Sequence, residues 1–497
     1  MPCPLLYSLL PDIASTYKLP TMSTKHEGQV EHIDHCDEVL KPTPQYDKFG
    51  SAAKTDPREI ALVKKIDLYM MPILWLMYFL NFLDRNAMVN GKLNNLSKDL
   101  HLHGTQYNTC VSILFVGYLL GQVPSNMLLN RVRPSWYMAG FMMGWAVIST
   151  LTCLVKDYHG MLVCRLLLGI VEAPFYPGAL FMISVFYNRK EATTRMAVLY
   201  TGNMLASSFS GLIAAGVFAG LDGAHGLAGW RWLFLIQGVA TFAVAIAAFF
   251  LLPNSPLQTR WLSPEERQMA YDRIARDTTQ KEDRTSTWKG LREACTDYRT
   301  WIFALQCNLH LSANGFKNFM PTVVKTLGFN STITLVLTCP PYLVATFASV
   351  IVSWSSGHFN ERTWHITISK LLAIIGFAVA CSTLNIGARY FAMILFVGAT
   401  YGVNNINLAW TAATLGQTDE KKAVAIAITN TLGNLASVYT PYLWPDSDAP
   451  RFSKAMYCSI GFSAGVIVTA WVLRWILMRT NRRIRAMDSE AINFYAY

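Results

Sequence analysis

The chain has 497 residues, of which 52% are hydrophobic and 15% are charged, and its mean hydropathy is +0.27. A soluble domain carries about 25% charged residues, so this composition excludes an ordinary water-soluble protein, which needs more charge to cover its surface. The apolar residues come in long blocks, and about 20 mostly apolar helical residues cross a bilayer core. We therefore predict an all-α polytopic membrane protein embedded in a lipid bilayer.

The net charge of +11 does not indicate a nucleic-acid partner. The basic residues cluster beside the ends of the apolar blocks, for example at Lys64 and Lys65, at Arg189 and Lys190, and from Arg479 to Arg485. This is the distribution that membrane proteins show next to their spans. No stretch interleaves basic and aromatic residues in the manner of a nucleic-acid-binding module.

Residues 1–66 are polar and are expected to form a disordered cytoplasmic tail. The first twelve residues hold three prolines and lack a basic start, so they do not predict a signal peptide, and Met22 is an alternative start. Ten cysteines are scattered without a CxxC pair, and we expect them to act as small apolar fillers. His32, His35 and Cys36 lack a second ligand cluster, so neither a metal site nor a cofactor is expected.

Twelve apolar segments follow, and each is expected to be a transmembrane helix because lipid-facing backbone must satisfy its own hydrogen bonds. A polar segment at 253–300 separates the first six from the last six, which gives two pseudo-symmetric halves at 67–252 and 301–478 and a basic cytoplasmic tail at 479–497. The twelve expected spans are 67–89, 108–129, 135–155, 160–183, 195–220, 231–252, 301–325, 332–354, 364–385, 388–412, 422–443 and 455–478.

The segment 253–300 is predicted to be a cytoplasmic linker that contains an amphipathic helix. Ser263 is a favourable N-cap, Pro264 suits the first helical position, and Glu265 and Glu266 place negative charge in the first turn.

An even number of spans places both chain ends on one side of the membrane. The region before the first span, the linker and the C-terminus are rich in lysine and arginine, so this side is predicted to be cytoplasmic. The short loops alone do not decide the orientation, since Lys92, Lys98, Arg451 and Lys454 fall on the opposite side. Two glycosylation sequons, at Asn95 and Asn330, fall in predicted external loops.

Charged side chains inside an apolar span are costly and usually face a cavity or a partner. The span at 67–89 carries Asp84 and Arg85, and the span at 160–183 carries Arg165 and Glu172. Arg165 and Glu172 are seven residues apart and therefore share one helix face. Gly169 lies between them and leaves room for a ligand or a closely packed helix.

Two prolines, Pro174 and Pro177, follow Glu172 and are expected to bend the helix near its middle. Transporters use such bends to open a binding site at the membrane midplane.

These two charged pairs suit proton-coupled transport of an anion. A guanidinium binds a carboxylate through two hydrogen bonds, and a buried carboxyl group binds a proton more readily once its neighbouring arginine turns to another anion. Arg85 and Arg165 are therefore candidate substrate ligands, and Asp84 and Glu172 are candidate proton-coupling residues. The alternative interpretation is a pair of static salt bridges, with Asp84 and Arg85 at the external end of their span.

Neutral polar residues lie in other spans. Candidate substrate contacts are Asn203, Asn314, Asn404 and Asn430. Hydrogen bonding between helices is the alternative interpretation for each of them. Several aromatic residues could line the same pocket or simply pack, namely Tyr118, Phe175, Tyr176, Tyr342 and Trp410.

Several motifs together resemble the anion:cation symporter family of the major facilitator superfamily, in its fungal allantoate, nicotinate and pantothenate permease branch. The matching stretches are Leu83-Asp84-Arg85-Asn86, Val123-Pro124-Ser125-Asn126, Arg131-Val132-Arg133-Pro134, Arg165 to Gly178, Trp230-Arg231-Trp232-Leu233-Phe234, Leu262 to Arg267, Lys421 to Ala425 and Asp448 to Phe452.

The resemblance implies the major facilitator fold, with twelve transmembrane helices, alternating access and proton-driven movement of small carboxylates. It also implies that Asp84, Arg85, Arg165 and Glu172 are the substrate and proton residues. The sequence departs from the family pattern after Arg85 and at Ala173-Pro174, which affects the expected substrate rather than the fold.

The function predicted from the sequence is symport of a small organic anion, a carboxylate or vitamin-like acid, with protons as the coupled ion. The first alternative is a carrier that exports or relocates a fungal secondary metabolite, and the second is a membrane receptor built on a carrier fold. No enzyme is expected, because the chain shows no nucleophile–base constellation, metal motif or phosphate loop. We expect a monomer in the plasma membrane, with a vacuolar or other internal membrane as the alternative location.

Overall fold

A computed structural model describes residues 56–129, 132–277, 287–416, 419–487 and Tyr495, and these ranges contain helices and loops but no strand. The prediction of an all-α protein is therefore confirmed. All of them lie in one unit that spans residues 54–497. A disordered tail was predicted for residues 1–66. Residues 1–55 lie outside the described residues, whereas residues 57–66 are helical. Most of the chain beyond Met487 also lies outside the described residues.

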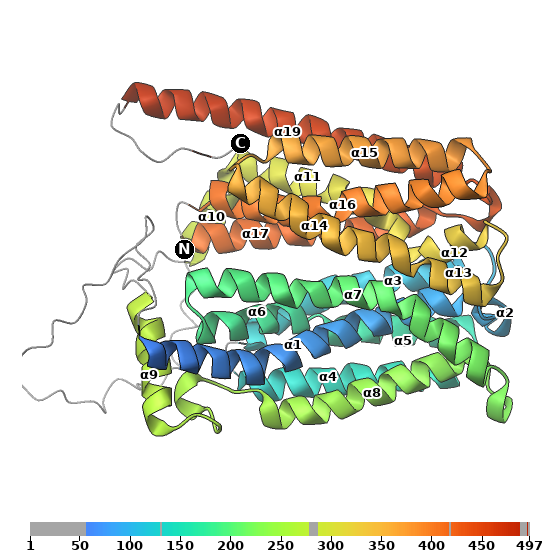
Figure 1. Ribbon diagram of the computed structural model, residues 1–497, viewed down its shortest axis with the longest axis horizontal. Coiled ribbons are helices and arrows are strands. Elements are labelled where there is room, and N and C mark those ends of the chain that lie inside the picture. The colour runs from blue at the N-terminus through green and yellow to red at the C-terminus, as the bar shows by residue number, and fades with distance from the viewer. Residues whose placement is uncertain (1–55, 130–131, 278–286, 417–418, 488–494, 496–497) are drawn as a thin grey trace, which may run out of the picture. The chain divides into compact units, whose positions relative to one another are not determined.

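Residues 57–251 form one group of helices, drawn in blue to green in Figure 1. Helix α1 packs against α7 and α8, α3 packs against α5, and α4 packs against α8. The bounds are α1 (Pro57–Gly91), α2 (Leu96–Asp99), α3 (Gln106–Leu129), α4 (Pro134–Leu151), α5 (Tyr158–Glu172), α6 (Phe175–Phe186), α7 (Arg189–Leu221) and α8 (Gly229–Leu251).

Residues 298–487 form a second group, drawn in yellow to red in Figure 1. Helix α16 packs against α14 and α15, and α19 packs against α15 and α11. The bounds are α11 (Tyr298–Ala313), α12 (Met320–Lys325), α13 (Ser331–Leu337), α14 (Cys339–His358), α15 (Thr363–Ser382), α16 (Ile386–Thr414), α17 (Asp419–Asn434), α18 (Ala436–Tyr439) and α19 (Ser453–Met487).

Nine helical segments within the described residues are long and apolar enough to cross a membrane. The three remaining expected spans coincide with α3, with α11 and α12, and with α17 and α18, so the elements are consistent with twelve crossings. Two boundaries differ most from expectation. Helix α1 begins at Pro57, where Asp56 caps it by accepting a hydrogen bond from the Arg58 amide, and α19 continues to Met487.

Several spans are broken rather than continuous. Helix α5 ends at Glu172 and α6 begins at Phe175, which is the interruption predicted from Pro174. A second break occurs between α11 and α12, where a 3₁₀ segment covers Asn314–Asn318. This break has no internal proline. The chain is closely packed at this break: if Gly315 carried a side-chain carbon, that atom would lie 3.0 Å from Thr440.

The linker helix α9 (Pro264–Asp277) packs against the start of α1 (Figure 1). Its first turn is capped reciprocally: the Ser263 amide donates to the Glu266 carboxylate, and the Glu266 amide donates to the Ser263 hydroxyl. Glu266 also accepts a hydrogen bond from Lys65 of α1 at 2.7 Å. Further along α9, the buried side chain of Arg273 pairs with Glu191 of α7.

A second charged cluster lies at the start of α11. Asp297 accepts hydrogen bonds from Arg299 Nη2 and from Lys421 Nζ of α17, both at 2.7 Å. Burial alone would raise the pKa of Asp297, but these hydrogen bonds outweigh it and lower the pKa to about 2. The carboxylate thus ties α11 to α17 at the predicted cytoplasmic end.

The two helix groups contact each other at the predicted external end. Lys92, just after α1, pairs with Asp446 at 2.7 Å. Ser331 of α13 donates a hydrogen bond to the Leu93 carbonyl at 3.2 Å. Deeper in the interface, Asn404 of α16 donates to the Tyr200 hydroxyl at 3.2 Å. Hydrogen bonds and an ion pair therefore hold the two groups together at this end.

We predict that Arg273→Ala destabilises the protein by about 3 kcal/mol, because it leaves the buried Glu191 carboxylate without this partner. Lys65→Ala removes a similar ion pair that is about one-third exposed to solvent, and it should cost under about 1 kcal/mol. Thermal unfolding of both variants in detergent measures the difference. Equal losses would show that Arg273 does not fix α9.

We predict that Asp297→Asn destabilises the protein at neutral pH and that this difference shrinks on acidification. The pKa of Asp297 is about 2 when folded and about 4 when unfolded. The ionised carboxylate therefore contributes stability above about pH 4 and loses it between about pH 4 and pH 2. Melting curves of both proteins across this range should converge toward pH 2, and a constant gap would contradict the assignment.

Candidate functional site

The centre of the site is a buried ion pair between α1 and α5. Arg85 Nε donates a hydrogen bond to Glu172 Oε2 at 2.5 Å. The Glu172 side chain is fully buried, and the Arg85 side chain is 16% exposed. The other carboxylate oxygen, Glu172 Oε1, has no hydrogen-bond partner within the described part of the chain. The glutamate is therefore buried inside the protein, while part of the arginine side chain remains accessible.

Asp84 lies next to Arg85 in sequence but points into a different environment. Its carboxylate accepts hydrogen bonds from Ser149 Oγ of α4 at 3.3 Å and from Thr241 Oγ1 of α8 at 3.1 Å. The residue is completely buried. Asp84 therefore sits among neutral hydroxyl groups inside the first helix group, and the structure does not pair it with Arg85.

Arg165 lies on the same face of α5 as Glu172, as their spacing predicts, and both residues are buried. Its Nη2 donates a hydrogen bond to the Arg85 backbone carbonyl at 3.4 Å. Its Nε and Nη1 have no partner among the described residues. Gly169 between them packs directly against α3, where any side chain would collide with the Leu114 carbonyl, so the glycine accommodates a neighbouring helix.

Aromatic rings surround the Arg85 guanidinium. Its central carbon lies 5.1 Å from the Phe82 ring centroid and 4.9 Å from that of Tyr118 of α3. Tyr78 stacks on Tyr176 with a centroid separation of 5.7 Å. Cation–π contacts of this kind stabilise a desolvated cation without neutralising it. Of the other aromatic candidates, Tyr342 lines a cavity, whereas Phe175 and Trp410 pack inside their own helix groups against Trp145 and Phe303.

The four asparagine candidates do not gather at one point. Asn404 bonds across the interface to Tyr200, Asn314 contacts His310 Nε2 at 3.2 Å, and Asn430 accepts a hydrogen bond from Asn434. Asn203 is half-buried in α7. Hydrogen bonding within and between helices thus accounts for Asn314, Asn404 and Asn430 as observed, and a role in binding remains a prediction.

The two sequon asparagines are exposed. Asn95 precedes α2, and Asn330 caps α13 by accepting a hydrogen bond from the Ile333 amide at 2.8 Å. The hydrogen bond between Ser331 and Leu93 places both sequons at the same end of the helix groups. Their glycosylation stays a prediction.

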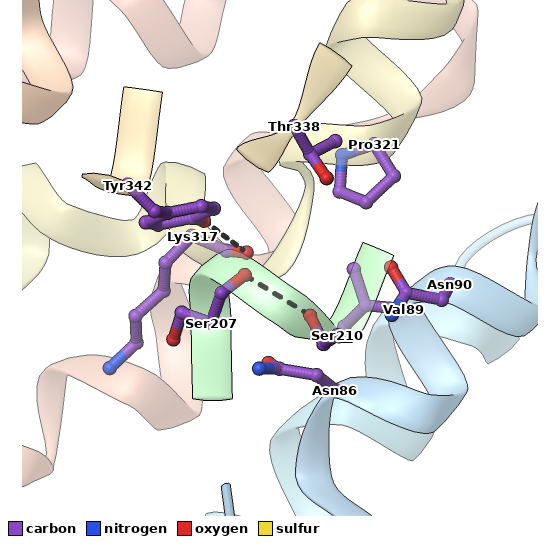
Figure 2. A pocket seen from close by; sticks show the side chains of 9 residues that line it. All are labelled: Asn86, Val89, Asn90, Ser207, Ser210, Lys317, Pro321, Thr338 and Tyr342. Atoms are coloured by element: carbon purple, nitrogen blue, oxygen red, sulfur yellow. Dashed lines mark hydrogen bonds between the residues drawn. The ribbon is translucent and has the colours of Figure 1, made fainter. Parts of the chain in front are cut away.

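The sequence analysis overlooked ionisable residues in the second half. Lys317 lies in the 3₁₀ break between α11 and α12 and lines a small polar cavity (Figure 2). Lys370 of α15 and His310 of α11 are completely buried, and Arg389 of α16 is bound by the Pro450 carbonyl at 2.7 Å. A search for any charged residue inside the apolar windows would have found all four.

A family model described as the Major Facilitator Superfamily matches residues 74–441. The chain belongs to the major facilitator superfamily. The MFS-type transporter cnsO of Penicillium expansum is 34% identical over 87% of this chain and 86% of its own length. The high-affinity nicotinic acid transporter of Saccharomyces cerevisiae is 29% identical over 90% of this chain and 83% of its own length.

Solved structures of this superfamily share the fold. A bacterial homologue of the human lysosomal transporter Spinster, in an inward-facing and occupied conformation, aligns with a TM-score of 0.67 over 83% of this chain and 97% of its own, at 15% identity. The xylose transporter XylE of E. coli aligns with a TM-score of 0.62 over 82% of this chain and 97% of its own, at 15% identity. This major facilitator protein is therefore a multi-pass integral membrane transporter and not an enzyme.

We predict that Arg85→Met destabilises the transporter by about 3 kcal/mol, because Glu172 then loses the guanidinium that neutralises it inside the protein. Adding Glu172→Gln should recover much of this loss, since a neutral amide needs no counter-charge. Melting temperatures of the two single variants and the double variant give the coupling between the sites. Additive losses would show that the two side chains do not interact in the folded protein.

Proposed function

We propose that this transporter moves a small organic anion, a carboxylate or vitamin-like acid, together with a proton. The observation that carries the proposal is the buried ion pair between Arg85 and Glu172. An arginine offers the solute's carboxylate two parallel hydrogen bonds, and the glutamate that now occupies it is the group that can take up a proton. Binding of the anion to Arg85 and protonation of Glu172 therefore both break the contact between Arg85 and Glu172.

The coupling follows from charge balance. While Glu172 is ionised it occupies Arg85, and an incoming anion has to displace it. Displacement leaves the carboxyl group buried without its counter-charge, and burial favours its neutral, protonated form. Anion binding and proton binding thus reinforce each other, which is the thermodynamic requirement for symport.

Two further residues support this cycle. Arg165 lies close to the Arg85 backbone, and two of its guanidinium nitrogens have no partner in the portion of the chain that the structure describes. It can therefore supply additional donors for the anion. Asp84 is held by two hydroxyl groups, which can stabilise either its charged or its protonated form, and we assign it a second proton-coupling role. The nicotinic acid transporter among the relatives supports an organic acid as the solute, because its named substrate is a small carboxylate.

We predict that Glu172→Gln abolishes accumulation driven by a pH gradient while leaving exchange of labelled for unlabelled solute intact, because the amide cannot carry the proton. The measurement is uptake into proteoliposomes with and without an inward proton gradient, using nicotinate, allantoate and pantothenate as the first probes. Asp157→Asn, at an exposed helix cap, is the control. Asparagine also caps helices well, so this variant should accumulate solute normally.

Arg165→Ala should instead lower binding of the acid in both assays, with a loss of at least about tenfold in affinity, as expected when a charged hydrogen-bond partner is removed. Full pH-driven accumulation by both Glu172→Gln and Arg165→Ala would overturn the assigned roles.

A further inference from the structure

A small polar cavity lies where the two helix groups meet, and Figure 2 shows its lining. The first group contributes Asn86 from α1 and Ser207 and Ser210 from α7. The second group contributes Lys317, Thr338 and Tyr342. The cavity thus combines one amine with several neutral hydrogen-bonding groups, and it includes side chains from both halves of the transporter.

Lys317 is the charged residue of this cavity, and the structure gives it no acidic partner among the described residues. Its Nζ lies 5.9 Å from the Phe115 ring centroid of α3. The Lys317 backbone carbonyl accepts a hydrogen bond from the Tyr342 hydroxyl at 3.4 Å. An ammonium group inside the membrane region needs a counter-charge, and the part of the chain that the structure describes does not supply one.

Arg85 and Lys317 approach the same face of α3 from the two halves: the Arg85 central carbon lies 4.9 Å from the Tyr118 ring centroid and the Lys317 Nζ lies 5.9 Å from the Phe115 ring centroid. These two rings are three residues apart on α3 and are therefore neighbours on the helix surface. The carboxylate of Glu172 is already committed to Arg85. Protonation of Glu172 would therefore leave two cations facing each other across the interface between the halves. Like charges at short range in a low-dielectric environment repel strongly, so this arrangement disfavours close approach of the halves unless an anion lies between them.

We propose that Lys317 is an anion-binding residue for the solute's acidic group, which it shares with Arg85 across the interface between the two halves. The inference rests on the proposed function in taking the solute to be an acid. It adds a substrate contact from the second half of the transporter, and it predicts which solutes the site accepts. A carboxylate that bridges Arg85 and Lys317 neutralises both, whereas an uncharged analogue of the same shape leaves their repulsion in place.

The remaining lining suits the same ligand. Asn86 carries an amide donor, which can bond a carboxylate oxygen that Lys317 does not reach. The hydroxyl groups of Ser207, Ser210 and Thr338 make the lining polar, although each already donates its proton to a backbone carbonyl. Such a lining offers little to a large apolar solute. The substrate class inferred here is therefore a compact organic acid recognised through its charge, and the corresponding carboxamide should be rejected.

The test measures binding without a pH gradient. Purified transporter is screened by ligand-induced thermal stabilisation with three acids and their uncharged amides: nicotinate and nicotinamide, benzoate and benzamide, and succinate and succinamide. Wild-type protein should be stabilised by at least one acid and not by its amide. Lys317→Met should weaken that acid at least about tenfold, and Lys317→Arg should retain most of the affinity because it keeps the charge.

Lys325→Met is the matched control, since Lys325 lies on α12 and binds the Phe329 carbonyl at 2.9 Å instead of lining the cavity. It should bind the acid like wild type. Unchanged affinity in Lys317→Met, equal binding of acid and amide, or no stabilisation by any acid would each overturn the inference. Loss of pH-driven accumulation plays no part in this assay, so failure here is distinct from failure of the proton-coupling proposal.

Discussion

The requirement that a charge inside a membrane protein be compensated governs this structure. The hydrogen-bonded pair of Arg85 and Glu172 meets it by joining α1 to α5, with the Glu172 side chain fully buried and the Arg85 side chain mostly so. Glu172 can occupy that position only because α5 lies tightly against α3, and that contact depends on glycines such as Gly117 and Gly169, whose side chains would otherwise strike the neighbouring backbone. The close packing of α5 against α3 therefore determines where the buried charge of Glu172 lies.

The part of the site in the first helix group could be predicted from sequence, because it depends on the spacing of residues within a single helix. The seven-residue spacing of Arg165 and Glu172 places them on one helix face whatever the tertiary structure, and Pro174 marks the end of that face. Proximity of Arg85 to Glu172 could be expected only through family resemblance. The assumed neighbourhood of Asp84 and Arg85 was misleading, because consecutive helical residues point in different directions, and Asp84 turns toward α4 and α8.

The second half was harder to predict for a physical reason. Lys317 lines the cavity because the helix gives way to a 3₁₀ segment at Asn314–Asn318, and no proline within that segment announces the break. The asparagines of this half were predicted to contact the substrate because they are polar residues in apolar spans. The side chains of Asn314 and Asn430, however, form hydrogen bonds within their own helical segments. Polarity alone does not separate a ligand contact from a packing contact.

Static salt bridges were the alternative explanation for the buried charges, and the pattern of unmet hydrogen bonds argues against it. A purely structural network in a low-dielectric interior is stabilising when its members are satisfied. Within the described ranges of the chain, two guanidinium nitrogens of Arg165 and one carboxylate oxygen of Glu172 have no hydrogen-bond partner. Lys317 likewise has no carboxylate partner in these ranges. In the transport cycle proposed above, an organic anion that enters with a proton would supply acceptors for these donors and leave Glu172 neutral. A static clamp gives no reason for these unpaired atoms, whereas the proposed site uses them to bind an anion and a proton.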